Sequence, residues 1–213
     1  MRELINTYGL ALLKALEIHT VYVLVSVAIG FAIGLLLGIL LSRKPAWSVI
    51  VLPVVSIFQT IPGLVFIGVL FIWIGMRPAT VIIALSIYAM FPVMKNTYTG
   101  ILEIDPKYID TANGCGMTSF QRLFQVELPL AMPTIIAGLR MATVYTVSWA
   151  VLAAMIGLGG LGDFIYQGTY TNNNLLILIG AVPSAILAVV LTGLIDFLQK
   201  KVTPEGLKKG GRS

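Results

Sequence analysis

Few side chains in this sequence could take part in catalysis or metal binding. The chain holds one cysteine, Cys115, and one histidine, His19, whereas a protein metal site usually needs three or four ligands. The glycine-rich stretch 157–163 superficially resembles a phosphate-binding loop, but it lacks the Gly-Lys-Ser/Thr ending. No nucleophile, base and orienting group occur together. We therefore expect no catalytic site, no metal site and no cofactor in this chain.

The most informative spacing lies in residues 105–129. Asp105 stands before a proline, which is typical of a helix start, because aspartate can cap free amides and proline suits the first helical position. Thr118 and Gln121 have the spacing of a capping box that opens a second short helix. Gly114-Cys115-Gly116 lies between the two helices and favours a turn. The segment is therefore expected to form a helix, a turn and a helix.

The second of these short helices would be amphipathic. Phe120, Leu123 and Phe124 are three or four residues apart and would share one face. The following Leu128-Pro129 is expected to end this helix before the next apolar run. From the residues alone, two interpretations stay open: the apolar face packs against the protein's own helices, or it docks onto a partner.

Polar residues also interrupt one of the apolar runs. Gln59, Thr60 and Pro62 fall in its middle, where an unpaired amide is unfavourable and proline frees a backbone carbonyl. A broken helix at this depth often marks a translocation path. It also fits a packing kink in which the Gln59 amide binds the freed carbonyl. Other hydroxyl groups that could line a path are those of Tyr88, Tyr145 and Ser148.

The composition indicates a protein whose solvent is lipid. Hydrophobic residues make up 58% of the 213 residues and charged residues only 11%, against about 25% charged in soluble domains. The net charge of +5 does not indicate nucleic-acid binding, because most basic residues lie at the ends of apolar runs. Such runs must be helical in lipid, since a lone strand would leave its backbone groups unpaired.

The expected fold is an all-α integral membrane protein with about five transmembrane helices. The apolar stretches are 19–42, 47–74, 79–97, 130–156 and 174–198. Residues 1–18 carry Lys14 and Glu17 and are expected to form an interfacial helix rather than a sixth span. Residues 199–213 are expected to be a cytoplasmic tail, so that residues 19–198 form one membrane domain.

The basic residues predict the orientation of these helices. With the N-terminus outside, the cytoplasmic side holds eleven of the 14 Lys and Arg residues, as expected when basic residues are retained inside. This places segment 105–129 and the C-terminus in the cytoplasm. His19 would lie at the outer edge of the first span, as an interfacial residue rather than a proton relay.

Two further patterns concern the packing of the spans. Gly30, Gly34 and Gly38 recur every fourth residue, which allows a neighbouring helix to approach closely. Packing within the chain is favoured over contact with a second copy. Asp196 precedes Lys200 by one helical turn and is expected to pair with it.

Segment 105–129 resembles the EAA loop of ABC importer permeases. That pattern is Glu-Ala-Ala, three residues, Gly, nine residues, Ile, one residue and Leu-Pro, and the spacing matches at every position. The matching residues are Asp110, Thr111, Ala112, Gly116, Val126, Leu128 and Pro129. Asp110, Thr111 and Val126 depart mildly from it. The resemblance implies a type I ABC importer permease fold, with a coupling helix that fits a groove of the ATP-hydrolysing subunit.

Four other blocks resemble the glycine betaine, carnitine and choline branch of that family. They are residues 59–62, 96–101, 127–130 and 157–163. The resemblance implies that the last block lies near the outer gate, where an external solute-binding protein would dock. Its candidate residues are Gly157, Gly159, Gly160, Gly162 and Asp163.

The resemblance therefore implies a cell-membrane permease subunit of an ATP-driven osmoprotectant importer. Its pore would be shared with a second copy or a paralogue, and ATP and Mg²⁺ would be held by a separate cytoplasmic ATPase. An importer of another small zwitterion, such as ergothioneine or methionine, is the first alternative. A secondary transporter is disfavoured, because the spans offer almost no ionisable groups away from their ends. A membrane scaffold without transport would leave the polar midspan residues unexplained.

Overall fold

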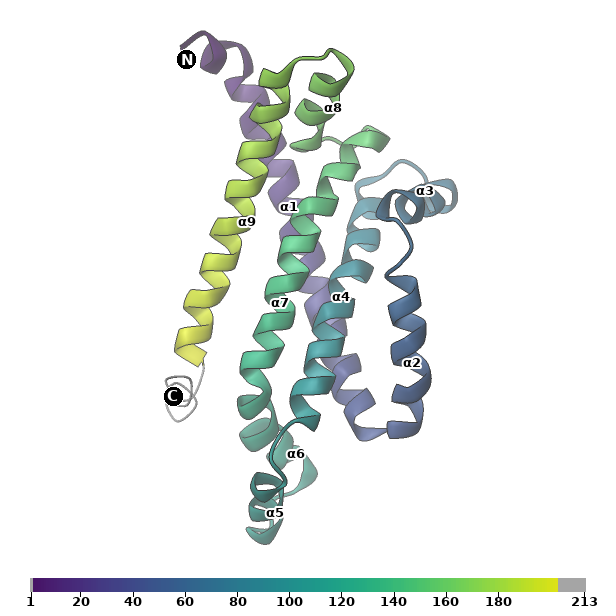
Figure 1. Ribbon diagram of the computed structural model, residues 1–213, viewed down its shortest axis with the longest axis vertical. Coiled ribbons are helices and arrows are strands. Elements are labelled where there is room, and N and C mark those ends of the chain that lie inside the picture. The colour runs from purple at the N-terminus through teal and green to yellow at the C-terminus, as the bar shows by residue number, and fades with distance from the viewer. Residues whose placement is uncertain (1, 203–213) are drawn as a thin grey trace.

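A computed structural model describes residues 2–202, with side chains from Tyr8 to Lys201. Most of the expected tail, residues 203–213, lies outside the described residues. Within the described residues, four helical segments are long and apolar enough to cross a membrane, or five if a bent pair counts as one span. Figure 1 shows these helices running side by side along the long axis, with two short helices, α5 (Pro106–Gly114) and α6 (Ser119–Arg122), at one end. The expected all-α membrane architecture is confirmed.

The first helix, α1 (Arg2–Arg43), is longer than the expected first span. It continues without a break through residues 18 and 19, so residues 2–18 are not a separate helix. The reason is visible at Ala15, which is buried against Leu161, Phe164 and Leu176. This face of the helix finds apolar partners within the protein.

The glycines of α1 pack against α4 (Pro78–Leu102). A Cβ atom added at Gly34 would lie 2.6 Å from the Met90 carbonyl oxygen, and one at Gly38 would lie 2.5 Å from Thr97 Cβ. Such distances leave room only for hydrogen at these positions. The prediction that the glycines serve packing within the chain is confirmed.

The second apolar stretch forms two helices instead of one. Helix α2 (Pro45–Phe58) and helix α3 (Gly63–Ile74) meet at an angle of 94°. The Tyr88 hydroxyl of α4 donates a 2.8 Å hydrogen bond to the Ile61 carbonyl in the connecting turn. At Gly63, any larger residue would collide with the Trp149 ring. The interruption that the sequence predicts in stretch 47–74 is therefore present as a sharp bend, and contacts from α4 and α7 (Leu128–Ala150) hold it.

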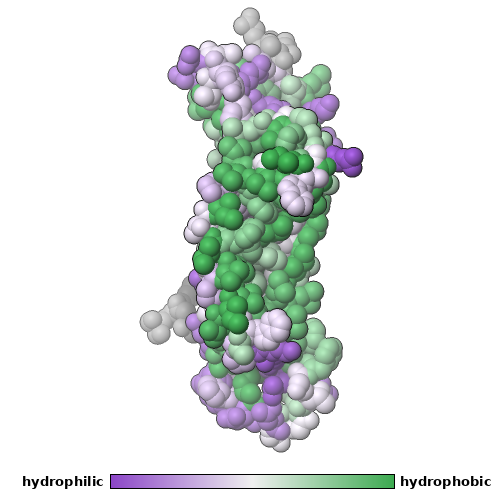
Figure 2. Space-filling view, turned by 90° about the vertical axis from the view of Figure 1, so that its right-hand side faces the viewer, coloured by the Kyte–Doolittle hydropathy of each residue, from purple (hydrophilic) through white to green (hydrophobic). Residues whose placement is uncertain are grey.

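Helix α7 (Leu128–Ala150) packs against α4 and ends in a 3-10 turn, Val151–Ile156. Helix α8 (Gly162–Tyr170) and helix α9 (Asn174–Val202) complete the described chain. The buried core between α1, α4 and α7 contains Val23, Leu85 and Val147. The long helices thus bury one face against each other. Figure 2 shows hydrophobic side chains over the middle of the molecule and hydrophilic ones at its two ends, as expected for contact with lipid.

Two polar side chains have partners on neighbouring helices that the sequence did not predict. His19 is fully buried, and its Nε2 lies 3.1 Å from the Val147 carbonyl of α7. Asp196 pairs with Arg140 of α7 rather than with Lys200, and Arg140 also donates to the Gln199 side chain at 3.1 Å. In both cases a neighbouring helix supplies the partner.

Candidate functional site

The two short helices at one end of the molecule begin with the caps that the sequence predicts. Helix α5 (Pro106–Gly114) starts after Asp105, whose side chain accepts a 3.0 Å hydrogen bond from the Lys107 amide. The Lys107 ammonium group lies 2.7 Å from the same carboxylate. Its hydrogen bond, together with that from the Lys107 amide, lowers the pKa of Asp105. The start of α5 is therefore fixed by its own local contacts.

A turn at Gly116 sets the direction of the next helix. Gly116 has φ +74°, in the left-handed region that favours glycine. The Gly116 amide donates to the Asn113 carbonyl at 2.9 Å, and the Met117 amide donates to the Ala112 carbonyl at 3.1 Å. Ala112 itself is buried. The predicted helix, turn and helix are confirmed.

Helix α6 (Ser119–Arg122) opens with the predicted capping box of Thr118 and Gln121. Beyond it, the rings of Phe120 and Phe124 lie 4.6 Å apart, and these side chains are 71% and 52% exposed. Leu123 is partly buried. The aromatic pair does not pack into the protein's own spans, which favours docking over self-packing. We call residues 105–124 the docking element.

The chain passes from α6 into α7 without the expected stop at Leu128-Pro129. Residues Leu123–Glu127 form a π-helical turn, and Pro129 lies in the first turn of α7. Proline lacks an amide hydrogen, and its ring would clash with the carbonyl four residues earlier in a regular helix. The π turn is wider than an α-helical turn, so it leaves room for the Pro129 ring and does not require the missing amide hydrogen. Leu128 packs with Ile101, Ala131 and Ile135, while Val126 is partly buried.

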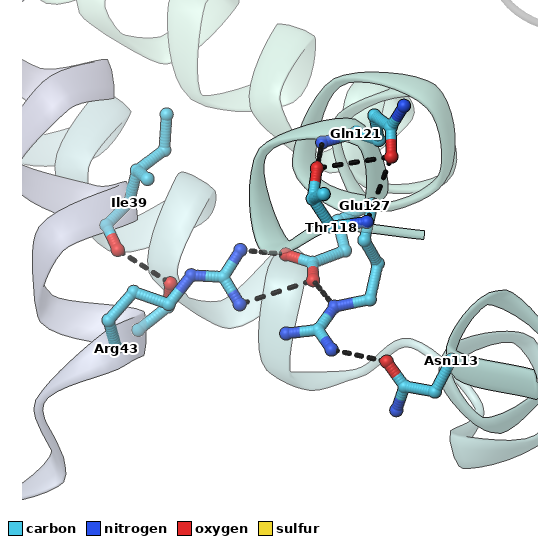
Figure 3. A network of polar contacts seen from close by, with 8 residues as sticks. Ile39, Arg43, Asn113, Thr118, Gln121 and Glu127 are labelled. Carbon is cyan, nitrogen blue, oxygen red and sulfur yellow. Dashed lines mark hydrogen bonds and ion pairs between the residues drawn. The ribbon is translucent and has the colours of Figure 1, made fainter. Parts of the chain in front are cut away.

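A buried carboxylate lies at the base of the docking element. Glu127 is 2% exposed and accepts hydrogen bonds from two arginines (Figure 3). Arg43, the last residue of α1, binds both carboxylate oxygens, with Nη1 3.1 Å from Oε1. Arg122 Nε donates to Oε1 at 2.9 Å, and Arg122 Nη1 donates to Asn113 Oδ1 at 2.6 Å. The sequence analysis missed this network.

The remaining docking residues lie on the surface of α5. Asp110 and Thr111 are exposed, and the Thr111 hydroxyl donates to the Lys107 carbonyl at 2.7 Å. Neither side chain packs in the core, so both are available to contact a partner.

The polar midspan residues lie in two places. Gln59 lines a groove of about 260 Å³ between α2 and α4, together with Ser56, Lys95, Tyr98 and apolar side chains. Tyr88 lies beside it, with its ring 4.0 Å from the Trp149 ring and its hydroxyl on the Ile61 carbonyl of the bend. The bend is thus held by Tyr88 rather than by the Gln59 amide.

The other candidates for a path are not gathered in that groove. The Thr60 hydroxyl donates to the Ile57 carbonyl at 2.7 Å, and the Ser148 hydroxyl donates to the Val144 carbonyl at 3.1 Å. Pro62 caps α3 with its backbone. Tyr145 is 49% exposed on α7. Their role in translocation stays a prediction.

The glycine-rich turn after α7 lies at the opposite end from the docking element (Figure 1). Gly157, Gly159 and Gly160 all have positive φ, at 71°, 78° and 103°. Gly162 packs so closely on the Val151 carbonyl that no larger residue fits. Asp163 lines a pocket of about 470 Å³ formed with the start of α1. Burial raises the pKa of Asp163.

Comparison with known proteins decides the family. The family of binding-protein-dependent transport system inner membrane components matches residues 30–204. This chain belongs to that family. This component is the transmembrane permease of an ABC importer and not an enzyme, because the ATPase of such a transporter is a separate subunit.

Several curated relatives are similar to the permease over most of its length. The carnitine transport permease protein OpuCB of Listeria monocytogenes is 39% identical over 90% of this chain and 88% of its own. The glycine betaine/carnitine/choline transport system permease protein OpuCB of Bacillus subtilis is 36% identical over 98% of this chain and 96% of its own. The choline permease OpuBB of the same organism is 35% identical over 97% and 95%.

A solved structure confirms the fold of the permease. A chain of the inward-facing MetNI methionine ABC transporter superposes with a TM-score of 0.83 at 23% identity. The match covers 93% of the permease and 99% of that chain. The predicted type I importer permease fold is therefore confirmed.

The buried, paired state of Glu127 was not predicted from the sequence. Glu127 was read only as part of block 127–130, although it is a lone acidic residue between the apolar Val126 and Leu128. A charge in such a setting is almost never fully buried unless it is paired. That rule was the available signal, but its partner Arg43 is 84 residues away.

Proposed function

We propose that the permease is the membrane subunit of an ATP-driven importer of quaternary ammonium osmoprotectants of the glycine betaine, carnitine and choline type. The observation that best supports this function is the exposed aromatic pair Phe120 and Phe124 on a docking element that is anchored to the spans. An apolar surface of this kind at the end of a membrane bundle fits a helix-in-groove contact with an ATPase. The solute class follows the names of the relatives.

In this proposal, segment 105–129 and the C-terminus lie in the cytoplasm, and the N-terminus lies outside. A second permease subunit, either another copy or a paralogue, completes the pore, because the described residues of one chain contribute at most five spans. A separate solute-binding protein delivers the solute to the outer face near Gly157 to Asp163. ATP and Mg²⁺ are held by the two ATPase subunits.

Different parts of the permease would bind the ATPase and line the solute path. Docking places the aromatic pair in the ATPase groove, so that closure of the ATPases on ATP displaces α5 and α6. The bend between α2 and α3, with Gln59 in the adjoining groove, provides polar groups at a depth where regular helices present only apolar ones. Displacement of the spans would open this region alternately to the two sides.

Uptake in reconstituted vesicles tests the proposal. The permease is purified in mild detergent with its copurifying ATPase, reconstituted, and supplied with solute-binding protein and radiolabelled glycine betaine, carnitine or choline. Uptake should require hydrolysable ATP and should be abolished by a non-hydrolysable analogue. Uptake that follows a sodium or proton gradient and ignores ATP would contradict it. ATP-driven uptake of methionine or ergothioneine, but of none of the three solutes, would contradict the assigned solute class.

A further inference from the structure

Glu127 joins parts of the permease that are distant in sequence. Arg43 reaches it from the end of α1, and Arg122 reaches it from α6. Through Arg122 the carboxylate is also linked to Asn113 of α5. One buried carboxylate therefore holds both helices of the docking element and the first span, as Figure 3 shows for Arg43, Glu127 and Asn113.

The backbone beside Glu127 is irregular. Glu127 is the last residue of the π-helical turn Leu123–Glu127, the direct backbone connection between α6 and α7. Short π turns inside α-helices are rare and are frequently found at functional sites. A force applied to α6 could be absorbed by distortion of this turn. The Arg122 to Glu127 contact spans the turn and opposes such distortion.

The Arg43 contact connects Glu127 to the membrane-spanning helices. Two residues after Arg43, the chain enters α2 at Pro45, and α2 leads to the 94° bend before α3. Helix α1 itself packs without space for a side chain on α4, at Gly34 and Gly38. A movement of the end of α1 would therefore be passed to the bend between α2 and α3. It would also be passed to α4, whose Tyr88 holds that bend.

A purely stabilising role explains this arrangement poorly. A buried ion pair is weak support for stability, because desolvation of the charges offsets much of their attraction, and it is better attested as a device that fixes geometry. Here two guanidinium groups surround one buried carboxylate, whereas, among the described residues, the Asp196 carboxylate between α7 and α9 pairs with Arg140 alone and is half-exposed.

We infer that Glu127 is a positioning residue that locks the docking element to α1, so that displacement of α5 and α6 moves the spans instead of distorting the π turn. The inference rests on the proposed function. It assigns the transmission of force to the Arg43, Glu127 and Arg122 contacts rather than to the helix backbone alone.

The ratio of ATP hydrolysed to solute imported tests this role. Vesicles containing the permease, its ATPase and the solute-binding protein are supplied with radiolabelled glycine betaine. Glu127→Gln should raise the ratio by about tenfold, within the range of typical coupling between sites, while the ATPase still copurifies. Arg43→Gln removes only the link to α1 and should raise the ratio similarly. Asp196→Asn, which breaks an arginine pair elsewhere, should leave the ratio unchanged.

Each outcome decides the inference. An unchanged ratio in Glu127→Gln, or loss of ATPase copurification in that variant, would contradict it, because the residue would then act only on turn geometry or folding. If Glu127→Gln does not accumulate, Arg43→Gln decides alone, and a normal ratio there overturns the inference. Absence of ATP-driven uptake in the wild-type complex would contradict the proposed function and the inference that rests on it. Normal wild-type uptake with unchanged ratios contradicts the inference alone.

Discussion

The Tyr88 hydroxyl donates a 2.8 Å hydrogen bond to the Ile61 carbonyl, across 27 residues of sequence. This carbonyl lies in the turn that separates α2 from α3, where the regular helical hydrogen bonds are interrupted. Tyr88 also packs on Phe66, Phe91 and Trp149. The bend is thus held by a specific polar contact inside an aromatic cluster.

Tyr88→Phe should loosen the bend without disturbing the aromatic packing. Hydrogen bonds between membrane helices contribute about 0.6 kcal/mol on average and up to about 1.7 kcal/mol, so the folded permease should survive. We expect slower ATP-driven uptake with normal membrane insertion and ATPase copurification. Tyr170→Phe, the same change at an 87% exposed tyrosine on α8, is the control. Equal uptake by the two variants would argue against a role for this bond.

Gly116→Ala should weaken ATPase binding. An L-residue in the left-handed region costs about 1–2 kcal/mol, and Gly116 has φ +74°. The strain would change the angle between α5 and α6 and lower the affinity for the ATPase by about tenfold, since about 1.4 kcal/mol corresponds to that factor. Gly75→Ala is the control, because Gly75 also has a positive φ, of 87°, and open space for a Cβ, but lies outside the docking element. The measurement is ATPase binding to the immobilised permease.

Phe120→Asp should release the ATPase while the spans stay inserted. The Phe120 side chain is 71% exposed, so its loss removes little from the permease's own packing. A charge on a docking face instead leaves an unpaired carboxylate in an apolar groove. Tyr170→Asp, at an 87% exposed aromatic on α8, is the matched change elsewhere. Normal ATPase copurification with Phe120→Asp would show that the contact lies on another surface.

Gly34→Ala should destabilise the permease in detergent. The new Cβ would lie 2.6 Å from the Met90 carbonyl oxygen and 2.9 Å from Val93 Cβ, so α1 would have to move away from α4. Overpacking of this kind typically costs about 1–3 kcal/mol. Gly193→Ala on α9 meets no atom within 4 Å and should be neutral. Thermal unfolding followed by circular dichroism compares them, and equal midpoints would contradict the close packing.

Cys115 reports the orientation of the docking element. It is the single cysteine of the chain, and it is exposed in the turn between α5 and α6. A membrane-impermeant maleimide should label the permease, expressed without its ATPase, in inside-out vesicles and not in intact right-side-out vesicles. Tyr170→Cys in a Cys115→Ser background should show the reverse pattern. Labelling of Cys115 from the outside would invert the proposed topology.

Sequence spacing was sufficient to predict the local structure of the docking element. The Asp105 cap, the Thr118 and Gln121 capping box and the turn at Gly116 all follow from hydrogen bonds and backbone angles within a few residues. The apolar runs likewise determined which segments are long helices, because the backbone groups of a span must be satisfied within it. The EAA spacing also predicted the protein family.

Only the tertiary structure decided which distant side chains meet. Glu127 binds Arg43 across 84 residues, and Asp196 binds Arg140 instead of the nearby Lys200. The 94° bend depends on Tyr88 from another helix. A helix presents the same side chains whichever neighbour it packs against, so the sequence fixes the faces but not their partners. Those partners are set by how α1, α4, α7 and α9 pack, and they turn a short docking element into part of the membrane bundle.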